Sequence, residues 1–317
     1  MSRLILVPQY PAKMRYSEWW ISDFEKHLSK YFDDIVILGK SKIKELELTK
    51  YNSIFSPINK SIEFENNQIK EYFKIKIYDD DILLLNDISF PGFFCNCLYH
   101  KKPKRCFSFC HATSKNYLDY FSKNRKTKFP IESNYSKMFN KVFVATNYHK
   151  EKLGWNNIEV VGLPKPPANI ISLKDINKIY DIISVNRPTN QKVNKSLEDQ
   201  IEKTLSLKVI RKQCLSWDEY SKFLSMSKIL LISSKEDTFN YTILDAIICK
   251  CIPICPDNLC FPEMLNDNYL YKNLDDSLSI INKVINNQLN VPQLLCQDNV
   301  DNFYLNISNL MKYEKEY

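Results

Sequence analysis

The chain has 317 residues, of which 44% are hydrophobic and 26% charged, with 18 Phe and 19 Tyr. This composition excludes a disordered or fibrous protein, and the length favours two domains over one. The ten Cys are irregularly spaced and favour reduced thiols, and no apolar stretch approaches the roughly 20 residues of a membrane-spanning helix. We therefore expect a cytoplasmic globular protein without a transmembrane segment.

Positive charge is concentrated in the first half of the chain. Residues 1–165 carry 27 Lys and Arg against 18 Asp and Glu, a net charge of +9, whereas the remainder has a net charge of −2. The excess is densest between Tyr99 and Phe129, where basic and aromatic residues are interleaved. Such a segment suits a polyanion whose bases or sugars stack on aromatic rings. A solvated basic face is the alternative interpretation.

Short apolar runs alternate with longer helical patterns along the chain. They are Leu4–Val7, Ile35–Leu38, Ile82–Leu85, Val142–Ala145 and Ile158–Val161, then Asp181–Val185, Ile229–Ile232 and Ile252–Cys255. Uninterrupted apolar runs are typical of parallel strands that are covered on both faces. The pattern therefore predicts an α/β protein with two doubly wound, Rossmann-like domains.

A run of prolines separates the two series of strands. Leu163–Ala168 has three prolines within four positions, which makes a stiff, extended connector. We place the domain boundary here, with an N-terminal domain over 1–165, a C-terminal domain over 166–299 and a last helix in 300–317. Two such domains are expected to face a central ligand cleft at the carboxyl ends of their strands.

The most informative segment follows the strand expected at Ile229–Ile232. Asp237 falls in the loop after this strand, and Asp245 lies about one turn inside the apolar helix that follows. The free backbone N–H groups at the start of a helix form an anion site. The segment therefore predicts a nucleotide-sugar pocket, in which the carboxylates accept from sugar hydroxyls and the amides hold phosphate. Its donor-binding residues are Thr238, Phe239, Asn240, Tyr241, Thr242 and Asp245.

A second segment carries two cations after the strand Asp181–Val185. Arg187 and Lys192 lie five residues apart in the loop that follows. Facing the anion site, such a pair can neutralise a diphosphate leaving group without a metal ion.

Together these segments resemble the C-terminal domain of group 1 glycosyltransferases, which have the GT-B fold. The hallmark of that family is two Glu separated by seven residues, a spacing that Asp237 and Asp245 reproduce. Leu244-Asp245-Ala246 and Cys251–Ile254 continue the pattern into the next strand. Both acids are Asp here, and Lys250 replaces the usual Gly at the end of the helix, where a left-handed cap is harder for a residue with a side chain.

The resemblance implies roles for these residues. The first acid, Asp237, would meet the donor sugar, and the second, Asp245, the ribose hydroxyls. Arg187 and Lys192 would stabilise the departing diphosphate, and no metal or other cofactor would be required. It further implies transfer from a UDP-sugar, with UDP-glucose the first candidate, and retention of the anomeric configuration. The last helix would cross back to the N-terminal domain, and the loop Arg211–Leu215 is expected to contact the nucleobase.

The N-terminal domain offers polar residues at the ends of two expected strands. Asp87 follows Ile82–Leu85, and His111 follows the run Phe107–Cys110. His111 matches a His that the family often carries near the donor sugar, where it would take a catalytic part. A structural histidine remains the alternative.

The loops Pro8–Trp20 and His111–Tyr117 resemble those of phage-type glycosyltransferases, including enzymes that decorate modified bases in DNA. Ser17 is expected to be the N-cap of the helix that follows the first loop, which places the residues just before it at the cleft edge. The candidate acceptor-binding residues are Arg15, Tyr16, Trp19, Asp87, Lys115 and Tyr117.

Two further patterns have competing interpretations. A set of Cys and His residues falls within a short stretch and could hold zinc, although its spacing matches no familiar zinc pattern and we predict no metal site. The set is Cys95, Cys97, His100, Cys106, Cys110 and His111. Trp19 and Trp20 are not expected both to face the core of one helix, so one could serve as an acceptor platform.

We therefore expect a glycosyltransferase whose acceptor is a 5-hydroxymethylpyrimidine in DNA. Reaching such a base in a duplex requires that it be flipped out. An acceptor in surface polysaccharide or lipid-linked saccharide synthesis is a second hypothesis. An inactive GT-B protein that binds nucleic acid or a nucleotide is a third, suggested by the Asp-for-Glu and Lys-for-Gly replacements. No protein partner is predicted.

Overall fold

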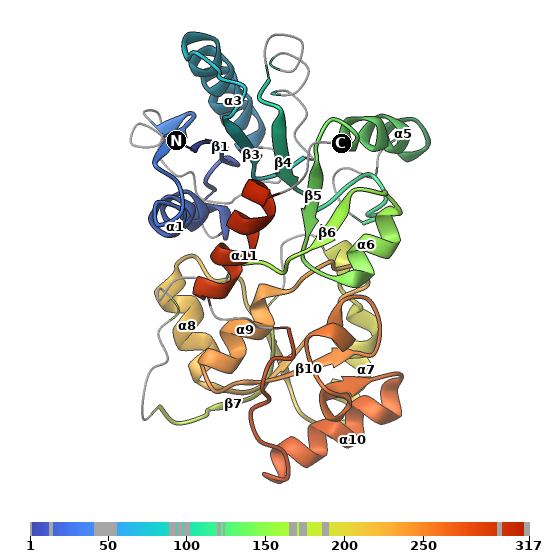
Figure 1. Ribbon diagram of the computed structural model, residues 1–317. Coiled ribbons are helices and arrows are strands. Elements are labelled where there is room, and N and C mark those ends of the chain that lie inside the picture. Colours follow the sequence, from blue (N-terminus) through green and yellow to red (C-terminus); the bar gives the residue numbers. More distant parts are fainter. Residues whose placement is uncertain are drawn as a thin grey trace. The chain divides into compact units, whose positions relative to one another are not determined.

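The structure is a computed structural model with two compact units, each built on its own parallel sheet (Figure 1). Unit 1 comprises Met1–Ala145, His149–Pro164 and Asp298–Tyr317, and unit 2 comprises Thr146–Tyr148 and Lys165–Gln297. The structure describes residues 2–12, 15–40, 56–88, 93, 97, 102–118, 122, 124–164, 170, 176–185, 190–296 and 300–313. Most of the connector expected after Pro164 lies outside these residues.

Unit 1 contains a six-stranded parallel sheet in the order β2-β1-β3-β4-β5-β6. Its strands are β1 (Arg3–Val7), β2 (Asp34–Ile37), β3 (Ile82–Leu85), β4 (Arg105–Phe109), β5 (Lys141–Val144) and β6 (Ile158–Val160). The chain runs from β1 to β2 on one side and returns to β3 on the other, so the order reverses between β1 and β3. Ligands bind at such a switch point in open parallel sheets.

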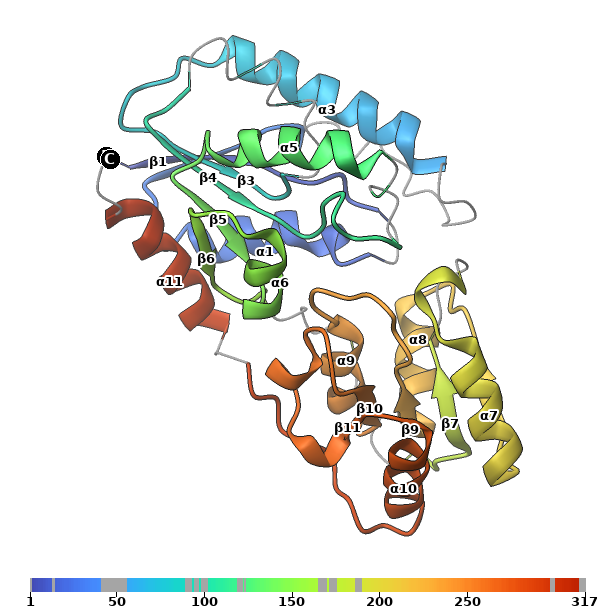
Figure 2. The same cartoon turned by 90° about the vertical axis from the view of Figure 1, so that its right-hand side faces the viewer.

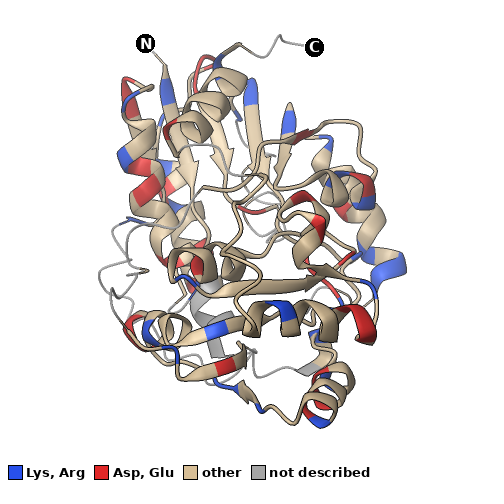
Figure 3. Ribbon diagram, turned by 90° about the horizontal axis from the view of Figure 1, so that it is seen from below, with Lys and Arg blue, Asp and Glu red and all other residues tan. Residues whose placement is uncertain are grey.

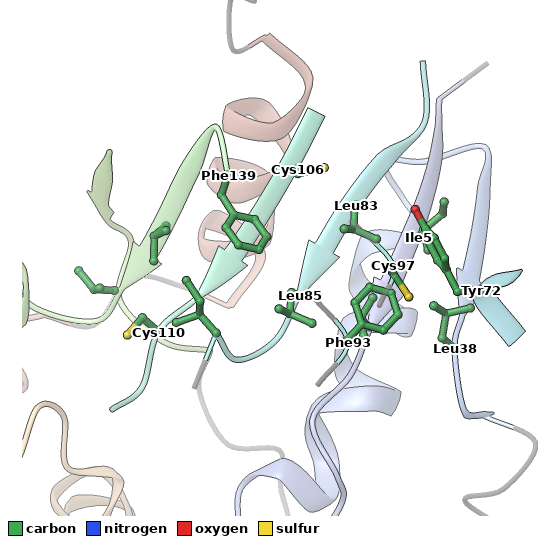
Figure 4. Close-up of a cluster of buried hydrophobic side chains, with 14 of the residues drawn as sticks. Ile5, Leu38, Tyr72, Leu83, Leu85, Phe93, Cys97, Cys106, Cys110 and Phe139 are labelled. Carbon is green, nitrogen blue, oxygen red and sulfur yellow. The ribbon is translucent and has the colours of Figure 1, made fainter. Parts of the chain in front are cut away.

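Helices cover both faces of this sheet (Figure 2). They are α1 (Ser17–Leu28), α3 (Ser56–Lys74), α5 (Arg125–Ser136), α6 (Asn147–Leu153) and α11 (Val300–Tyr313). On one face Tyr72 of α3 packs with Leu83, Leu85 and Phe93 in a continuous buried cluster (Figure 4). On the other face, Phe24 of α1 contacts Phe109 of β4 and Tyr304 of α11, with ring centroids 5.7 and 5.4 Å away. Both faces are therefore dry, which explains the uninterrupted apolar strands.

Unit 2 contains a five-stranded parallel sheet in the order β11-β10-β9-β7-β8. Its strands are β7 (Tyr180–Ser184), β8 (Val209–Arg211), β9 (Ser227–Leu231), β10 (Ile252–Pro256) and β11 (Leu270–Tyr271). Its helices are α7 (Lys195–Leu205), α8 (Trp217–Ser225), α9 (Tyr241–Ile248) and α10 (Leu274–Ile285), with short 3-10 turns η2 (Asn190–Lys192), η3 (Phe261–Glu263) and η4 (Asp267–Tyr269). Here the order reverses between β7 and β9.

The predicted α/β class is confirmed, and two local expectations are wrong. Ser17 is not the N-cap of α1, because Tyr16 takes that position and Ser17 Oγ instead accepts from the backbone N–H of Ala12 at 3.3 Å. Trp19 and Trp20 are both buried, at 5% and 9% exposure. The helix can bury both because its apolar stripe is wide and α11 packs beside it.

Lys250 ends α9 in the left-handed conformation that usually belongs to glycine, with φ 55°. The backbone N–H of Cys251 donates to the carbonyl of Ala246 at 2.8 Å, which closes the helix end. Lys178 Nζ donates to the carbonyls of Cys249 and Lys250 at 3.3 and 2.8 Å. A cation at the negative end of the helix dipole therefore supports a cap that its residue type disfavours.

Gly39, which follows β2, allows α3 to approach the sheet. Its φ is +80°, and a Cβ there would lie 2.9 Å from Cε2 of Phe64, whose side chain is fully buried. Gly162 has a similar φ of +77°, and among the described residues other than its chain neighbours no atom lies within 4 Å of the position that its Cβ would take. The two glycines therefore share the same backbone demand and differ only in the space around them.

Replacing Gly39 with Ala is expected to lower the free energy of unfolding by about 1–3 kcal/mol more than Gly162→Ala. Both variants place Ala in a left-handed backbone conformation, which is unfavourable for a residue with a Cβ. Only Gly39→Ala also forces Phe64 and α3 away from the sheet. Chemical denaturation of the two variants measures the difference. Equal losses of stability would contradict this packing account.

Candidate functional site

The segments that follow β7 and β9 meet at the switch point of the unit 2 sheet. The backbone N–H of Lys235 donates to the carbonyl of Lys192 at 2.7 Å, and that of Asn194 donates to the carbonyl of Ser233 at 2.8 Å. Val193 and Ser234 form an antiparallel bridge between these hydrogen bonds. The segment after β7 is thereby held against the loop after β9. This places the backbone of Lys192 beside the loop that leads to Asp237.

Arg187, the other predicted cation, lies outside the described residues. Lys192 ends η2, and its side chain is partly exposed. Of the two predicted cations, the structure therefore places the backbone of Lys192 beside the loop that leads to Asp237.

A buried carboxylate joins the strand ends at this place. Glu198 of α7 is fully buried and accepts from Ser184 Oγ, Ser233 Oγ and Arg211 Nε, each at 2.7 Å. Ser184 ends β7, Ser233 follows β9 and Arg211 ends β8. Burial alone would lower the pKa of Arg211, but its hydrogen bonds to Glu198 and Glu202 outweigh this effect and raise the pKa. One side chain thus ties three parallel strands together at their carboxyl ends.

Asp237 organises the start of α9. Its Oδ1 accepts from the backbone N–H of Thr238 at 3.1 Å, and its Oδ2 accepts from Asn240 Nδ2 at 2.8 Å. Asn240 is the N-cap of the helix, and its Oδ1 accepts from the backbone N–H of Thr242 at 3.0 Å. The backbone N–H of Thr242, one of the predicted donor-binding residues, is therefore not open to phosphate, because the N-cap side chain accepts from it.

Asp245 and Tyr241 face the interior of unit 2. Asp245 has no exposed surface, and its Oδ2 accepts from Tyr220 Oη of α8 at 3.0 Å. Tyr241 is also buried and packs edge-to-face on Phe239, with centroids 5.1 Å apart. The carboxylate expected to meet the ribose is therefore enclosed by α8 and α9 in this structure. Ribose would reach it only after a side-chain rearrangement that exposes Asp245.

The loop expected to contact a nucleobase, Arg211–Leu215, begins in the same network. Arg211 is bound by three acids of α7, at 2.7 Å to Glu198, 2.9 Å to Asp199 and 3.1 Å to Glu202. Leu215 is exposed, and its backbone N–H donates to Glu219 Oε2 at 2.8 Å. Arg211 therefore has a structural role at the end of β8.

His111 of unit 1 follows β4 and packs against Trp20 of α1, with ring centroids 4.5 Å apart. Its Nε2 lies 2.8 Å from the carbonyl oxygen of Asn86. A carbonyl only accepts hydrogen bonds, so Nε2 carries the proton and Nδ1 is the acceptor of the neutral ring. Burial lowers the pKa of His111, against an opposing effect of Asp87, so the ring is neutral at pH 7. Geometry and charge therefore suit a hydrogen-bond acceptor.

Two further polar side chains are buried in unit 1. Asn86 is 1% exposed, and neither its Oδ1 nor its Nδ2 has a hydrogen-bond partner among the described residues. His149 of α6 is equally buried, and burial, reinforced by the neighbouring His111 and Lys152, lowers its pKa to about 3. Neither residue was singled out from the sequence, because a lone Asn beside a strand and a lone His in a helix carry no distinguishing pattern.

A small pocket opens at the switch point between β1 and β3. It is lined by Val7, Pro8, Gln9, Tyr10, Glu65, Gln68, Leu85, Asp87 and Phe93, and its volume is about 30 Å³. Asp87 is 5% exposed, and its Oδ2 accepts from Gln9 Nε2 at 2.9 Å. Burial and the charge of Asp87 raise the pKa of Glu65 to about 7. Glu65 was missed from the sequence, because it lies on α3 with no motif around it.

The predicted acceptor residues Lys115 and Tyr117 occupy different surroundings. Lys115 Nζ donates to the carbonyls of Lys152 and Leu153 at 2.8 and 3.3 Å and so caps α6. Burial and two neighbouring cations, Arg125 first, lower the pKa of Lys115. Tyr117 is 61% exposed, and the guanidinium of Arg125 lies 4.1 Å from its ring centroid. An exposed ring among cations therefore marks this surface.

The first turn of α5 adds to this positive charge. It carries Arg125, Lys126 and Lys128 and no acidic residue. Cations are unfavourable at the positive end of a helix dipole unless an anion is nearby.

Charged residues of both units lie mostly on helices and connecting segments (Figure 3). We call Lys115, Tyr117, Arg125, Lys126, Lys128 and Lys152 the basic surface.

The remaining acceptor candidates lie before and within α1. Arg15 and Tyr16 are partly exposed, and the ring of Tyr16 packs edge-to-face on Trp19 at 5.5 Å between centroids. Trp19 itself is buried and offers little ring surface to a ligand.

Among the residues that the structure describes, no three His, Cys, Asp or Glu side chains are grouped to hold a metal ion. Cys95 and His100 lie outside those residues. Cys97, Cys106 and Cys110 are buried free thiols, and burial raises their pKa. In the same part of the chain, no helix has the length and apolar character needed to cross a membrane.

No family model matches the chain. A stretch of 110 residues is 26% identical to the tRNA-queuosine alpha-mannosyltransferase of Drosophila melanogaster, and covers 35% of this chain and 28% of that protein. The similarity therefore spans little more than a quarter of that relative.

Solved structures are similar over nearly the whole chain. Anabaena HepE in complex with UDP-glucose has a TM-score of 0.60 and 10% identity, and the match covers 98% of this chain and 96% of HepE. Sucrose-phosphate synthase from Thermosynechococcus elongatus also has a TM-score of 0.60, at 8% identity, with 99% and 94% covered. TarM has a TM-score of 0.53 and 15% identity, with 79% of this chain and 55% of TarM covered. The chain has the GT-B fold of these glycosyltransferases.

Replacing Glu198 with Gln is expected to lower the free energy of unfolding by about 2–3 kcal/mol, because the amide leaves the hydroxyls and guanidinium without their charged partner. Asp199→Asn, on the same helix and largely exposed, should cost less than about 1 kcal/mol. Chemical denaturation compares the two. A Glu198→Gln variant as stable as Asp199→Asn would contradict the role assigned to this network.

Proposed function

We propose that the chain is a glycosyltransferase that moves a hexose from a UDP-sugar to a hydroxyl group on a modified base of nucleic acid. UDP-glucose is the first candidate donor, and a 5-hydroxymethylpyrimidine in DNA is the first candidate acceptor. The GT-B fold supports sugar transfer, and HepE, which has this fold, was solved with UDP-glucose and with UDP and glucose. The observation that carries the acceptor class is the exposed Tyr117 ring among the cations of the basic surface.

The donor would be held by unit 2 at the switch point between β7 and β9. Lys192 and Arg187 would neutralise the diphosphate, and the start of α9 would add its dipole and the amides of Phe239 and Tyr241. Asp237 would meet the sugar while it orients the N-cap Asn240. Asp245 would meet the ribose once its contact with Tyr220 opens.

The transfer we propose retains the anomeric configuration. The bond between the sugar C1 and the diphosphate oxygen breaks, and a bond from C1 to the acceptor oxygen forms on the same face. The departing diphosphate oxygen takes the acceptor proton. Because Arg187 and Lys192 would neutralise the diphosphate, the proposed reaction needs no metal ion. His111, neutral and with Nδ1 as acceptor, would hydrogen-bond a sugar hydroxyl.

The acceptor would bind unit 1 through the basic surface. Cations there would neutralise phosphates, and the exposed ring of Tyr117 would stack on a base or sugar. Arg15 and Tyr16 are further acceptor contacts in this proposal, together with Asp87, whereas the buried Trp19 would support Tyr16. A base within a duplex would have to leave the stack to be modified.

A modified base in tRNA is a second candidate acceptor. The observation that favours it is the similarity of one third of the chain to a tRNA-queuosine alpha-mannosyltransferase. Both candidates share the chemistry of a phosphate backbone and a hydroxyl on a base.

The test is nucleoside mass spectrometry after incubation of the protein with UDP-sugars and nucleic acid. We expect one hydroxymethylpyrimidine nucleoside in DNA to gain the mass of one hexose, with no gain in matched DNA that carries 5-methylcytosine. A gain in tRNA nucleosides alone would replace the first acceptor with the second. Release of UDP without any nucleoside gain would remove nucleic acid as acceptor, and no consumption of any donor would remove the enzyme proposal.

In the same assay Lys192→Gln should lower kcat/KM for the donor about 100-fold, because one cation facing the diphosphate is lost. Lys195→Gln, an exposed lysine at the start of α7, should change it less than about twofold and serves as the matched control.

A further inference from the structure

We propose that the pocket between β1 and β3 binds a hydroxyl-bearing group of the acceptor, held between the carboxyl groups of Glu65 and Asp87. The inference rests on the proposed function only in assigning that hydroxyl to an acceptor. The pocket and its chemistry depend on unit 1 alone.

The pocket lies where a parallel sheet presents a ligand site. It is lined by Gln9, which follows β1, and by Asp87, which follows β3, and these adjacent strands mark the reversal of strand order. Leu85 and Phe93 contribute apolar walls from the buried cluster (Figure 4). A concave apolar site with a few converging polar groups at a switch point is typical of a small-molecule site.

The polar side chains of the pocket are held in place. Gln68, one turn after Glu65 on α3, donates through Nε2 to the carbonyls of Pro8 and Leu38 at 2.8 and 3.3 Å. These bonds fix α3 against the ends of β1 and β2. Gln9, which follows the adjacent strand β1, donates a hydrogen bond through Nε2 to the Asp87 carboxylate at 2.9 Å. The two carboxyl groups are therefore presented by a helix and a strand that cannot easily move apart.

Glu65 is partly protonated near neutral pH. Burial first, and then the charge of Asp87, raises the pKa of Glu65 to about 7. The other polar side chains that line the described pocket are Gln9, Gln68 and Tyr10, and Asp87 also faces His111, whose pKa burial lowers. When Glu65 is protonated, its hydroxyl can donate a hydrogen bond while a carboxyl oxygen of Asp87 accepts one.

A hydroxyl group matches this pair because it also donates one hydrogen bond and accepts another. The volume of about 30 Å³ has room for roughly two water-sized groups, which suits a hydroxymethyl substituent. An ammonium group would need both carboxylates ionised. It would therefore bind more tightly as pH rises, whereas a hydroxyl held by the protonated pair binds less tightly.

The experiment uses the full chain with carbon-13-labelled carboxyl groups and the probe 5-hydroxymethyl-2′-deoxycytidine. The matched probe is 5-methyl-2′-deoxycytidine, which lacks only the hydroxyl. We expect the hydroxymethyl probe to shift the Glu65 carboxyl resonance and to raise its titration midpoint. Its affinity should fall about tenfold between about pH 6 and about pH 9, because the pair loses its proton in that range.

The variants separate binding from structure. Glu65→Gln keeps a hydrogen-bond donor, so it should retain affinity and lose the pH dependence. Asp87→Asn removes the charged acceptor and should weaken binding of the hydroxymethyl probe about tenfold or more. Glu63→Gln, an exposed carboxyl on the same helix, should change neither the affinity nor the pH profile.

Equal binding of both probes, an unmoved Glu65 resonance, or affinity that rises with pH would each overturn the inference. Sugar transfer with an unchanged KM in Glu65→Gln and Asp87→Asn, at every pH tested, would overturn it and leave the proposed function standing. Hydroxyl-dependent binding without any sugar transfer would leave the inference standing and remove the proposed function.

Discussion

The reversal of strand order in each parallel sheet is the constraint on which both candidate sites depend. In unit 1 the chain crosses from β2 past β1 to β3, and in unit 2 it crosses from β8 past β7 to β9. The loops that follow the two central strands then diverge. The pocket lined by Gln9 and Asp87 lies at the crossing in unit 1, and the buried network of Glu198 with Ser184 and Ser233 lies at the crossing in unit 2.

The residues at the two crossings differ in chemistry. In unit 2 a fully buried carboxylate, Glu198, is satisfied by two hydroxyls and a guanidinium, so its charge serves to hold strand ends. The loops beside this network carry Lys192 and Asp237 and lead to the start of α9. In unit 1 the residues that line the described pocket include the carboxyl groups of Glu65 and Asp87 but no Lys or Arg. In the proposed reaction unit 2 would therefore hold the anionic leaving group, and unit 1 the neutral hydroxyl.

The sequence predicted the parallel sheets because strands such as β3 are apolar on both faces. It missed β8, whose three residues end in Arg211, and β11, which has two residues, because neither forms a longer apolar run. It placed Lys192 and Asp237 in adjacent loops through motif spacing. It could not show that Asn240 occupies the Thr242 amide or that Tyr220 encloses Asp245, because both depend on side-chain geometry. Glu65 was not predicted for the same reason, since its raised pKa arises from tertiary burial beside Asp87.

The proposed mechanism depends above all on unit 2 holding the nucleotide at the loops that meet beside α9. Hydrogen–deuterium exchange of the full chain, with and without saturating UDP, tests this dependence without an acceptor, since bound amides open less often. We expect slower exchange in residues 190–194 and 233–242, with residues 3–12 and 82–88 of unit 1 unchanged. Protection confined to the unit 1 segments, or no protection of 233–242 at saturating UDP, would contradict it.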